Sequence, residues 1–132
     1  MRRNYTKSSF GETWLEDGII HQVISPKVKK ITLEIAKQLV DDRENASGTV
    51  GLNVRVLVIV NNAVSVDKEA KEYYKEPRAY KNIIAIAMFV DNYVARMVGN
   101  IIFKINKPFV PTSFFNDKTK AIHWLRGFEN LN

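Results

Sequence analysis

The sequence predicts a single α/β domain in which a four- to five-stranded mixed sheet with an N-terminal β-hairpin packs against about four helices. Three observations lead to this prediction. The dipeptide Asp17-Gly18 separates two alternating segments, residues 54–60 and 83–90 are continuous apolar runs, and the intervening segments carry apolar residues at helical spacing. The chain has 132 residues, 45% of them hydrophobic, which is enough to bury one core of ordinary size.

The first half of the chain is expected to form a hairpin, a helix and a central strand. Asp17 and Gly18 both tolerate positive φ, so the flanking segments should pair as antiparallel strands. Thr32 is a suitable N-cap for a helix that reaches about Glu44, before the glycine-containing segment 45–51. Residues 54–60 are nearly all β-branched and apolar, as in a strand covered on both faces.

The second half should add two strands and three helices. Ser65 or Asp67 can cap a helix that ends at Pro77, and residues 83–90 give a second buried strand. A third helix should follow over residues 92–105, because apolar residues recur there at helical spacing. Beyond two prolines, a short strand within 111–117 leads to a last helix with an apolar stripe.

Composition and motifs argue against several classes of function. We expect one domain over residues 10–132. Residues 1–9 are either a disordered tail or a folded segment, and the sequence does not decide between the two. The chain contains no cysteine, its longest apolar runs are too short to span a bilayer, and it carries no GxSxG, P-loop or GxGxxG motif. His21 and His123 are far apart and lack metal-ligand spacing. We therefore expect a soluble, cytoplasmic, non-enzymatic protein with no cofactor, no metal and no transmembrane segment.

The charge pattern leaves the class of partner open. The net charge of +6 could attract nucleic acid, anionic lipid or an acidic protein. Tyrosines and basic residues do alternate over residues 71–81, but glutamates at 69, 72 and 76 dilute that positive field. Nucleic acid is therefore not the expected partner.

The predicted third helix offers a candidate partner or ligand surface. Helical geometry places Phe103 and Gly99 opposite the apolar face, and an interior glycine costs up to ~1 kcal/mol relative to alanine. A close approach to that face could come from residues 108–115, from a second copy of the chain or from an apolar ligand. Arg96 and Lys104 flank the same region and could hold an anionic group.

Three stretches of the chain resemble a known superfamily. These are GII near the start, VLVIVNNAVSVDKEAKEYY in the middle and ARMVGNIIFKINKPFVPTSFFNDKTKAIHWL near the end. Together with the element order they resemble the SpoIIAA-like (STAS) and Sec14-like superfamily, and more narrowly a small uncharacterised bacterial branch of it. The likeness runs from about Glu12 to Leu125 and is most specific in the C-terminal half.

The resemblance implies a SpoIIAA-like fold and a regulatory or protein-interaction role. Members similar to the best-known STAS proteins are switched by phosphorylation at the start of the helix that follows the central strand. If Asp67 matches the acidic residue before that switch, Lys68 occupies the phosphoacceptor position, and Ser65 is the nearby hydroxyl. Ser65 is thus a candidate phosphosite or a plain N-cap. We expect a self-associating module, a homodimer with an unknown protein partner, and as the alternative a carrier or sensor of a small apolar or anionic ligand.

Overall fold

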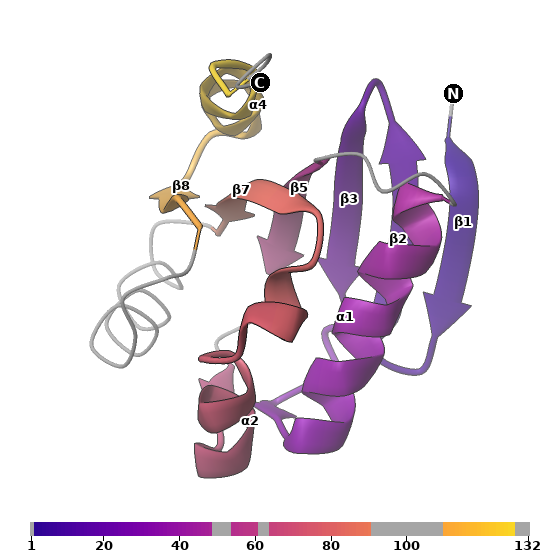
Figure 1. Cartoon of the computed structure of the whole chain (residues 1–132), viewed down its shortest axis with the longest axis vertical. Helices are drawn as coiled ribbons and strands as arrows, with labels where there is room; N and C mark the ends of the chain where they lie inside the picture. Colours follow the sequence, from indigo (N-terminus) through magenta and orange to yellow (C-terminus); the bar gives the residue numbers. More distant parts are fainter. Residues whose placement is uncertain (1, 49–53, 61–63, 91–109, 129–132) are drawn as a thin grey trace.

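A six-stranded mixed sheet forms the centre of the molecule. The computed structural model describes residues 2–48, 54–60, 64–90 and 110–128, and Figure 1 shows the arrangement. The strand order is β1-β2-β3-β5-β7-β8, with antiparallel pairing from β1 to β3 and parallel pairing from β3 to β8. The strands are β1 (Arg3–Ser8), β2 (Gly11–Glu16), β3 (Ile19–Ile24), β5 (Val54–Val60), β7 (Ile83–Phe89) and β8 (Thr112–Phe115). The predicted mixed sheet is confirmed, but it has more strands than the four to five expected.

The hairpin between β2 and β3 turns at the predicted dipeptide. Asp17 has φ 52° and Gly18 has φ 78°, so both central residues adopt the left-handed conformation of a tight two-residue turn. Trp14 pairs with His21, and Thr13 pairs with Gln22. The turn therefore sets the register in which these side chains meet.

The N-terminal residues form a strand. From the sequence alone, they could have been a disordered tail or a folded segment. Residues 3–8 form β1, with Thr6 opposite Thr13 and Lys7 opposite Glu12. The register shifts between Arg3 and Thr6, where Asn4 has φ 53° and its side-chain amide donates to the Ala46 carbonyl at 3.1 Å. Residues 3–8 are thus a strand, for which β2 and the end of the first helix provide hydrogen-bond partners.

Two helices cross over one face of the sheet. Helix α1 (Leu33–Ser47) connects β3 to β5, and its first turn is capped by Thr32, whose hydroxyl accepts from the Ile35 amide at 3.3 Å. This confirms the predicted cap. Helix α2 (Lys68–Tyr73) and a 3₁₀ helix (Pro77–Tyr80) connect β5 to β7. The helix predicted up to Pro77 is thus shorter than expected, because the chain turns after Tyr73 and Pro77 starts the 3₁₀ helix.

The sheet separates two apolar cores. Along β5, Val56 and Val58 face α1 while Leu57 faces helix α4 (Lys118–Arg126), as expected for a strand covered on both sides. The larger core lies on the α1 face and includes Ile20, Leu39, Val40, Val56, Val58, Ala70 and Ile86. The smaller core, under α4, consists of Ile19, Leu57, Ala85, Ala87, Ala121 and Leu125.

Within the described ranges the chain has three α-helices, against about four predicted. The third predicted helix, residues 92–105, lies outside the described residues. Two further strands, β4 (Lys30–Ile31) and β6 (Ser65–Val66), pair in parallel as a separate small sheet and were not predicted, because two residues give no periodic signal. No helix in the described part of the chain has the length and apolar character needed to cross a membrane.

Candidate functional site

Most of the predicted site residues fall on the segment that the structure leaves undescribed. Arg96, Gly99, Phe103 and Lys104 all lie between residues 91 and 109. The partner surface predicted on the helix of residues 92–105 stays a prediction. The same holds for the alternative, a ligand-binding cleft beside that helix. The structure instead describes Ser65 and a groove on the other helices.

Ser65 lies in β6 and is exposed, three residues before the first residue of α2. Its backbone N–H donates to the Lys29 carbonyl at 3.1 Å, and it lies opposite Lys30 in the small sheet. The cap of α2 is Asp67, whose carboxylate accepts from the Ala70 amide at 2.9 Å. The prediction that Ser65 is a plain N-cap of α2 is therefore wrong, because its backbone belongs to strand β6. Its candidacy as a phosphosite stays a prediction.

A groove of about 460 Å³ lies between α1 and α2 and continues to the 3₁₀ helix. We call it the helix groove. Helix α1 contributes residues from its first two turns, and the segment from α2 to the 3₁₀ helix contributes the rest. Its lining consists of Leu33, Lys37, Lys68, Glu69, Glu72, Tyr73, Glu76 and Arg78.

The charges of the helix groove are balanced. Its lining contains three basic and three acidic side chains beside the apolar Leu33 and Tyr73. Glu72 forms an ion pair with Lys75 at 3.1 Å, and Glu76 forms one with Arg78. The Arg78 guanidinium also lies 5.5 Å from the centre of the Tyr73 ring, within cation–π range. The groove therefore combines a buried aromatic ring with an exposed, locally neutral charge pattern.

Three tyrosines beside the groove belong to the core rather than to a polar helix surface. Tyr73 is buried and packs at 5.9 Å from Tyr74. Burial raises the pKa of Tyr73, Tyr74 and Tyr80, that of Tyr80 to about 12 despite the opposing Arg43 charge. All three phenols therefore keep their protons near neutral pH, and none of them is available as a general base.

A buried polar network fixes α1 on the sheet. The Gln22 amide nitrogen donates to the Leu39 carbonyl at 2.9 Å and to the Thr13 hydroxyl at 3.2 Å, while its oxygen accepts from Arg43 Nε at 2.7 Å. All four residues are buried. Buried polar groups cost free energy unless they are paired, so this network specifies one position of α1. Its role is structural, because all of its members are buried.

A second polar cluster lies on the α4 face, where Trp14 and His21 stack in parallel. Their ring centres are 5.4 Å apart at 4°, and the two side chains are only 5% and 6% exposed. The Arg2 guanidinium lies 3.9 Å above the Trp14 ring, and Trp14 Nε1 donates to Glu16 at 3.0 Å. The Nδ1 atom of His21 is buried and has no hydrogen-bond partner within the described residues. His21 is therefore a buried residue, whereas His123 is exposed.

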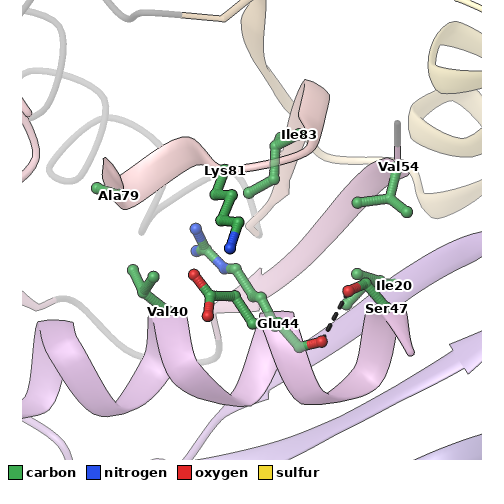
Figure 2. Close-up of a pocket in the computed structure, with 9 residues that line it drawn as sticks. Ile20, Val40, Glu44, Ser47, Val54, Ala79, Lys81 and Ile83 are labelled. Atoms are coloured by element: carbon green, nitrogen blue, oxygen red, sulfur yellow. Dashed lines mark hydrogen bonds between the residues drawn. The ribbon is translucent and has the colours of Figure 1, made fainter. Parts of the chain in front are cut away.

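A small cavity lies at the opposite end of α1 from the helix groove. Its volume of about 10 Å³ is close to that of one water molecule. Figure 2 shows Glu44 from α1 and Lys81 from the segment before β7 reaching into the same space. Such a cavity is too small for an organic ligand.

Among the described residues there is also no group of three or more side chains that could hold a metal ion.

The helix groove could not be found from sequence alone. Residues 67–81 carry alternating charges, but nothing in the sequence linked them to Leu33 and Lys37. Only the β4–β6 pairing and the packing of α1 against α2 bring the two segments together.

Comparison with known proteins gives one family and one solved structure. A family model described as "Domain of unknown function (DUF7793)" matches residues 13–129. None of the curated proteins matches the chain. The chain is similar to the crystal structure of an uncharacterized protein from the DUF3478 family with a SpoIIAA-like fold from Shewanella loihica PV-4. That similarity has 15% sequence identity, a TM-score of 0.48 and coverage of 95% of both chains.

Proposed function

The chain belongs to the DUF7793 family, and from this premise we propose that it is a non-enzymatic regulatory or protein-interaction module that associates with a second copy of itself through the helix groove. We also propose a SpoIIAA-like fold. The order of the parallel strands supports it, because each crossover adds the next strand on the same side of the last. The sequence stretches that resemble the STAS superfamily support it independently.

A non-enzymatic role is supported by the exposure of the ionisable groups in the helix groove. Lys37, Lys68, Glu69 and Glu72 are all exposed to solvent. Acid–base and nucleophilic groups in enzymes are usually desolvated or held by a partner that shifts their pKa. An open, charged groove suits a protein surface better than a small molecule, whose sites are mostly apolar and enclosed.

The observation that carries the proposal is the charge balance of the helix groove. A net charge of +6 opposes the approach of two copies, so a self-contact needs a region where the charges cancel. A two-fold contact also brings one surface patch against itself, which favours a patch that carries both signs. The groove has three cations, three anions and the partly buried side chain of Leu33.

Charge reversal within the groove tests the proposal. The wild-type chain should be a dimer by sedimentation velocity and by light scattering. Lys37→Glu with Lys68→Glu should raise the dimer dissociation constant by at least about tenfold, because like charges then face one another across the two-fold axis. Glu69→Lys with Glu72→Lys should have the same effect.

Dimerisation in a mixture of the two double variants is the decisive measurement. The negative groove of one variant and the positive groove of the other should form a heterodimer with a lower dissociation constant than that of either variant's own homodimer. Lys27→Glu with Lys29→Glu is the matched control, since it makes the same charge change at exposed positions outside the groove. A strictly monomeric wild type, or a control that dissociates as readily as the groove variants, would contradict the proposal.

A further inference from the structure

Strand β1 forms one edge of the six-stranded sheet. It pairs with β2 on one side, and no described element lies along its other side (Figure 1). An edge strand offers a row of backbone N–H and C=O groups to which another extended chain can pair. The alternation of an antiparallel ladder fixes which groups point outward. Ser8 lies opposite Gly11 across a two-residue loop. The pair that closes such a loop is usually hydrogen-bonded, and the pairs alternate along the ladder, so we infer that the N–H and C=O of Lys7 face away from β2.

The side chains of this edge are basic. Arg2, Arg3 and Lys7 lie within residues 2–11, and that segment contains no acidic residue. Two copies of β1 would therefore repel one another, whereas an acidic strand would be attracted. Charge alone can also serve to protect an edge from unwanted pairing.

Tyr5 is a feature of this edge that protection from unwanted strand pairing does not explain. Its side chain is 49% exposed, and it is the one large hydrophobic residue found exposed among those described. Its ring stacks at 6.4 Å from the ring of Trp14, so the row Tyr5, Trp14 and His21 runs across three strands on the α4 face. Lys7 lies two residues after Tyr5 and therefore on the same face. The outermost ring of this row is thus about half exposed to solvent.

The edge is also held in place, which lowers the entropic cost of adding a strand. Asn4 is bonded to the end of α1, Arg2 lies over Trp14, and the Tyr5 hydroxyl donates to the Glu12 carboxylate. These three contacts attach β1 to two different elements. A partner strand would meet an ordered template rather than a frayed terminus.

We propose that the outer edge of β1 binds an extended acidic segment of a partner protein by β-strand addition. The segment pairs with the outward backbone groups at Lys7, places carboxylates beside Arg2 and Lys7, and packs an apolar or aromatic side chain against Tyr5. This surface is separate from the helix groove, so the two proposals stand or fall independently.

A synthetic peptide tests the proposal with the full chain. In the probe, glutamates and one tyrosine share a face and valines line the other, with a fluorescein label for anisotropy. The wild type should bind it saturably. Arg2→Glu with Lys7→Glu should weaken binding by about tenfold or more, and a lysine-for-glutamate peptide should bind that variant instead. The matched control Lys27→Glu with Lys29→Glu should bind as the wild type does, and so should the groove variant Lys37→Glu with Lys68→Glu.

Proline at position 7 separates strand addition from simple charge attraction. Lys7→Ala removes only the charge and should weaken binding severalfold. Lys7→Pro removes the outward N–H as well, at an edge position where proline is tolerated, and should abolish binding while circular dichroism stays unchanged. Equal binding by these two variants, equal binding of a proline-interrupted acidic peptide, or no binding by the wild type would overturn the proposal. So would a dimer that Lys7→Pro dissociates, since the edge would then belong to a second copy.

Discussion

His21 is surrounded by groups that keep its imidazole neutral. Burial lowers its pKa below the usual 6.5, and the Lys118 ammonium of α4 and the Arg2 guanidinium lower it further. Glu16 acts in the opposite direction, through its carboxylate and through a backbone hydrogen bond. Because Nδ1 has no partner within the described residues, a proton added there would find no acceptor among them. The neutral ring stacked on Trp14 is thus part of the folded state.

The consequence is a loss of stability in mild acid. A histidine whose pKa is lower in the folded state than in the unfolded state contributes fully above about pH 6.5, and its contribution is lost as the pH falls below that value. Urea unfolding followed at a series of pH values should show this decline. His21→Gln should flatten the slope between pH 6.5 and the range where carboxylates titrate.

The exposed His123 supplies the matched control for this experiment. His123→Gln should leave the slope of the wild type unchanged. A wild-type free energy of unfolding that is constant over the window, or a slope that disappears with His123→Gln instead, would contradict the assignment to His21.

At the scale of elements, the cap of α2 distinguishes two neighbouring polar residues. Asp67 accepts from the Ala70 amide, whereas Ser65 lies in β6 with its side chain exposed. Asp67→Ala should therefore lower the free energy of unfolding by about 1 kcal/mol, the usual cost of losing an N-cap. Ser65→Ala should change it by less than about 0.5 kcal/mol, as expected for an exposed position. Chemical denaturation of both variants measures the difference, and the reverse order would contradict the structural role of Asp67.

Elements with strong local signals could be predicted from the sequence. The β2–β3 hairpin follows from Asp17-Gly18, β5 from its apolar run and α1 from Thr32 and its periodicity, because each depends on residues close in the chain. Strand β1 could not be predicted, since RNYTKS has no apolar alternation. It is a strand because β2 offers it hydrogen bonds, and such tertiary effects leave no trace in local composition.

The candidate site was less predictable than the fold for the same reason. The helix groove joins Leu33 and Lys37 to a segment more distant in the chain, and neither part has a motif. The network of Gln22 and Arg43 likewise links a strand to a helix through side chains that look unremarkable in sequence. Contacts of this kind are set by sheet order and helix packing, which periodicity alone does not give.

At the scale of the whole molecule, both cores depend on the same strands. Val56 and Val58 of β5 belong to the larger core, while Leu57 of the same strand belongs to the smaller one. Loss of β5 would expose both cores together, so we expect the described elements to unfold as one cooperative unit.

The two tryptophans offer a test of this cooperativity, because Trp14 reports on β2 and Trp124 reports on α4. Variants that keep only one of them, Trp14→Phe and Trp124→Phe, should each show a single fluorescence transition in urea. In each variant the transition should coincide with the loss of helical circular dichroism measured on the same protein. A fluorescence midpoint clearly apart from the circular dichroism midpoint would divide the chain into separately folding parts.

The order of strands in the sheet is the same as their order along the chain. Each strand is therefore added to an edge that earlier residues have already built, and no later strand has to insert between two formed neighbours. Assembly can begin at the local β2–β3 hairpin and extend stepwise in both directions, so that each step closes a loop of moderate length. During synthesis, the emerging chain would then meet its next pairing partner in the order in which it leaves the ribosome.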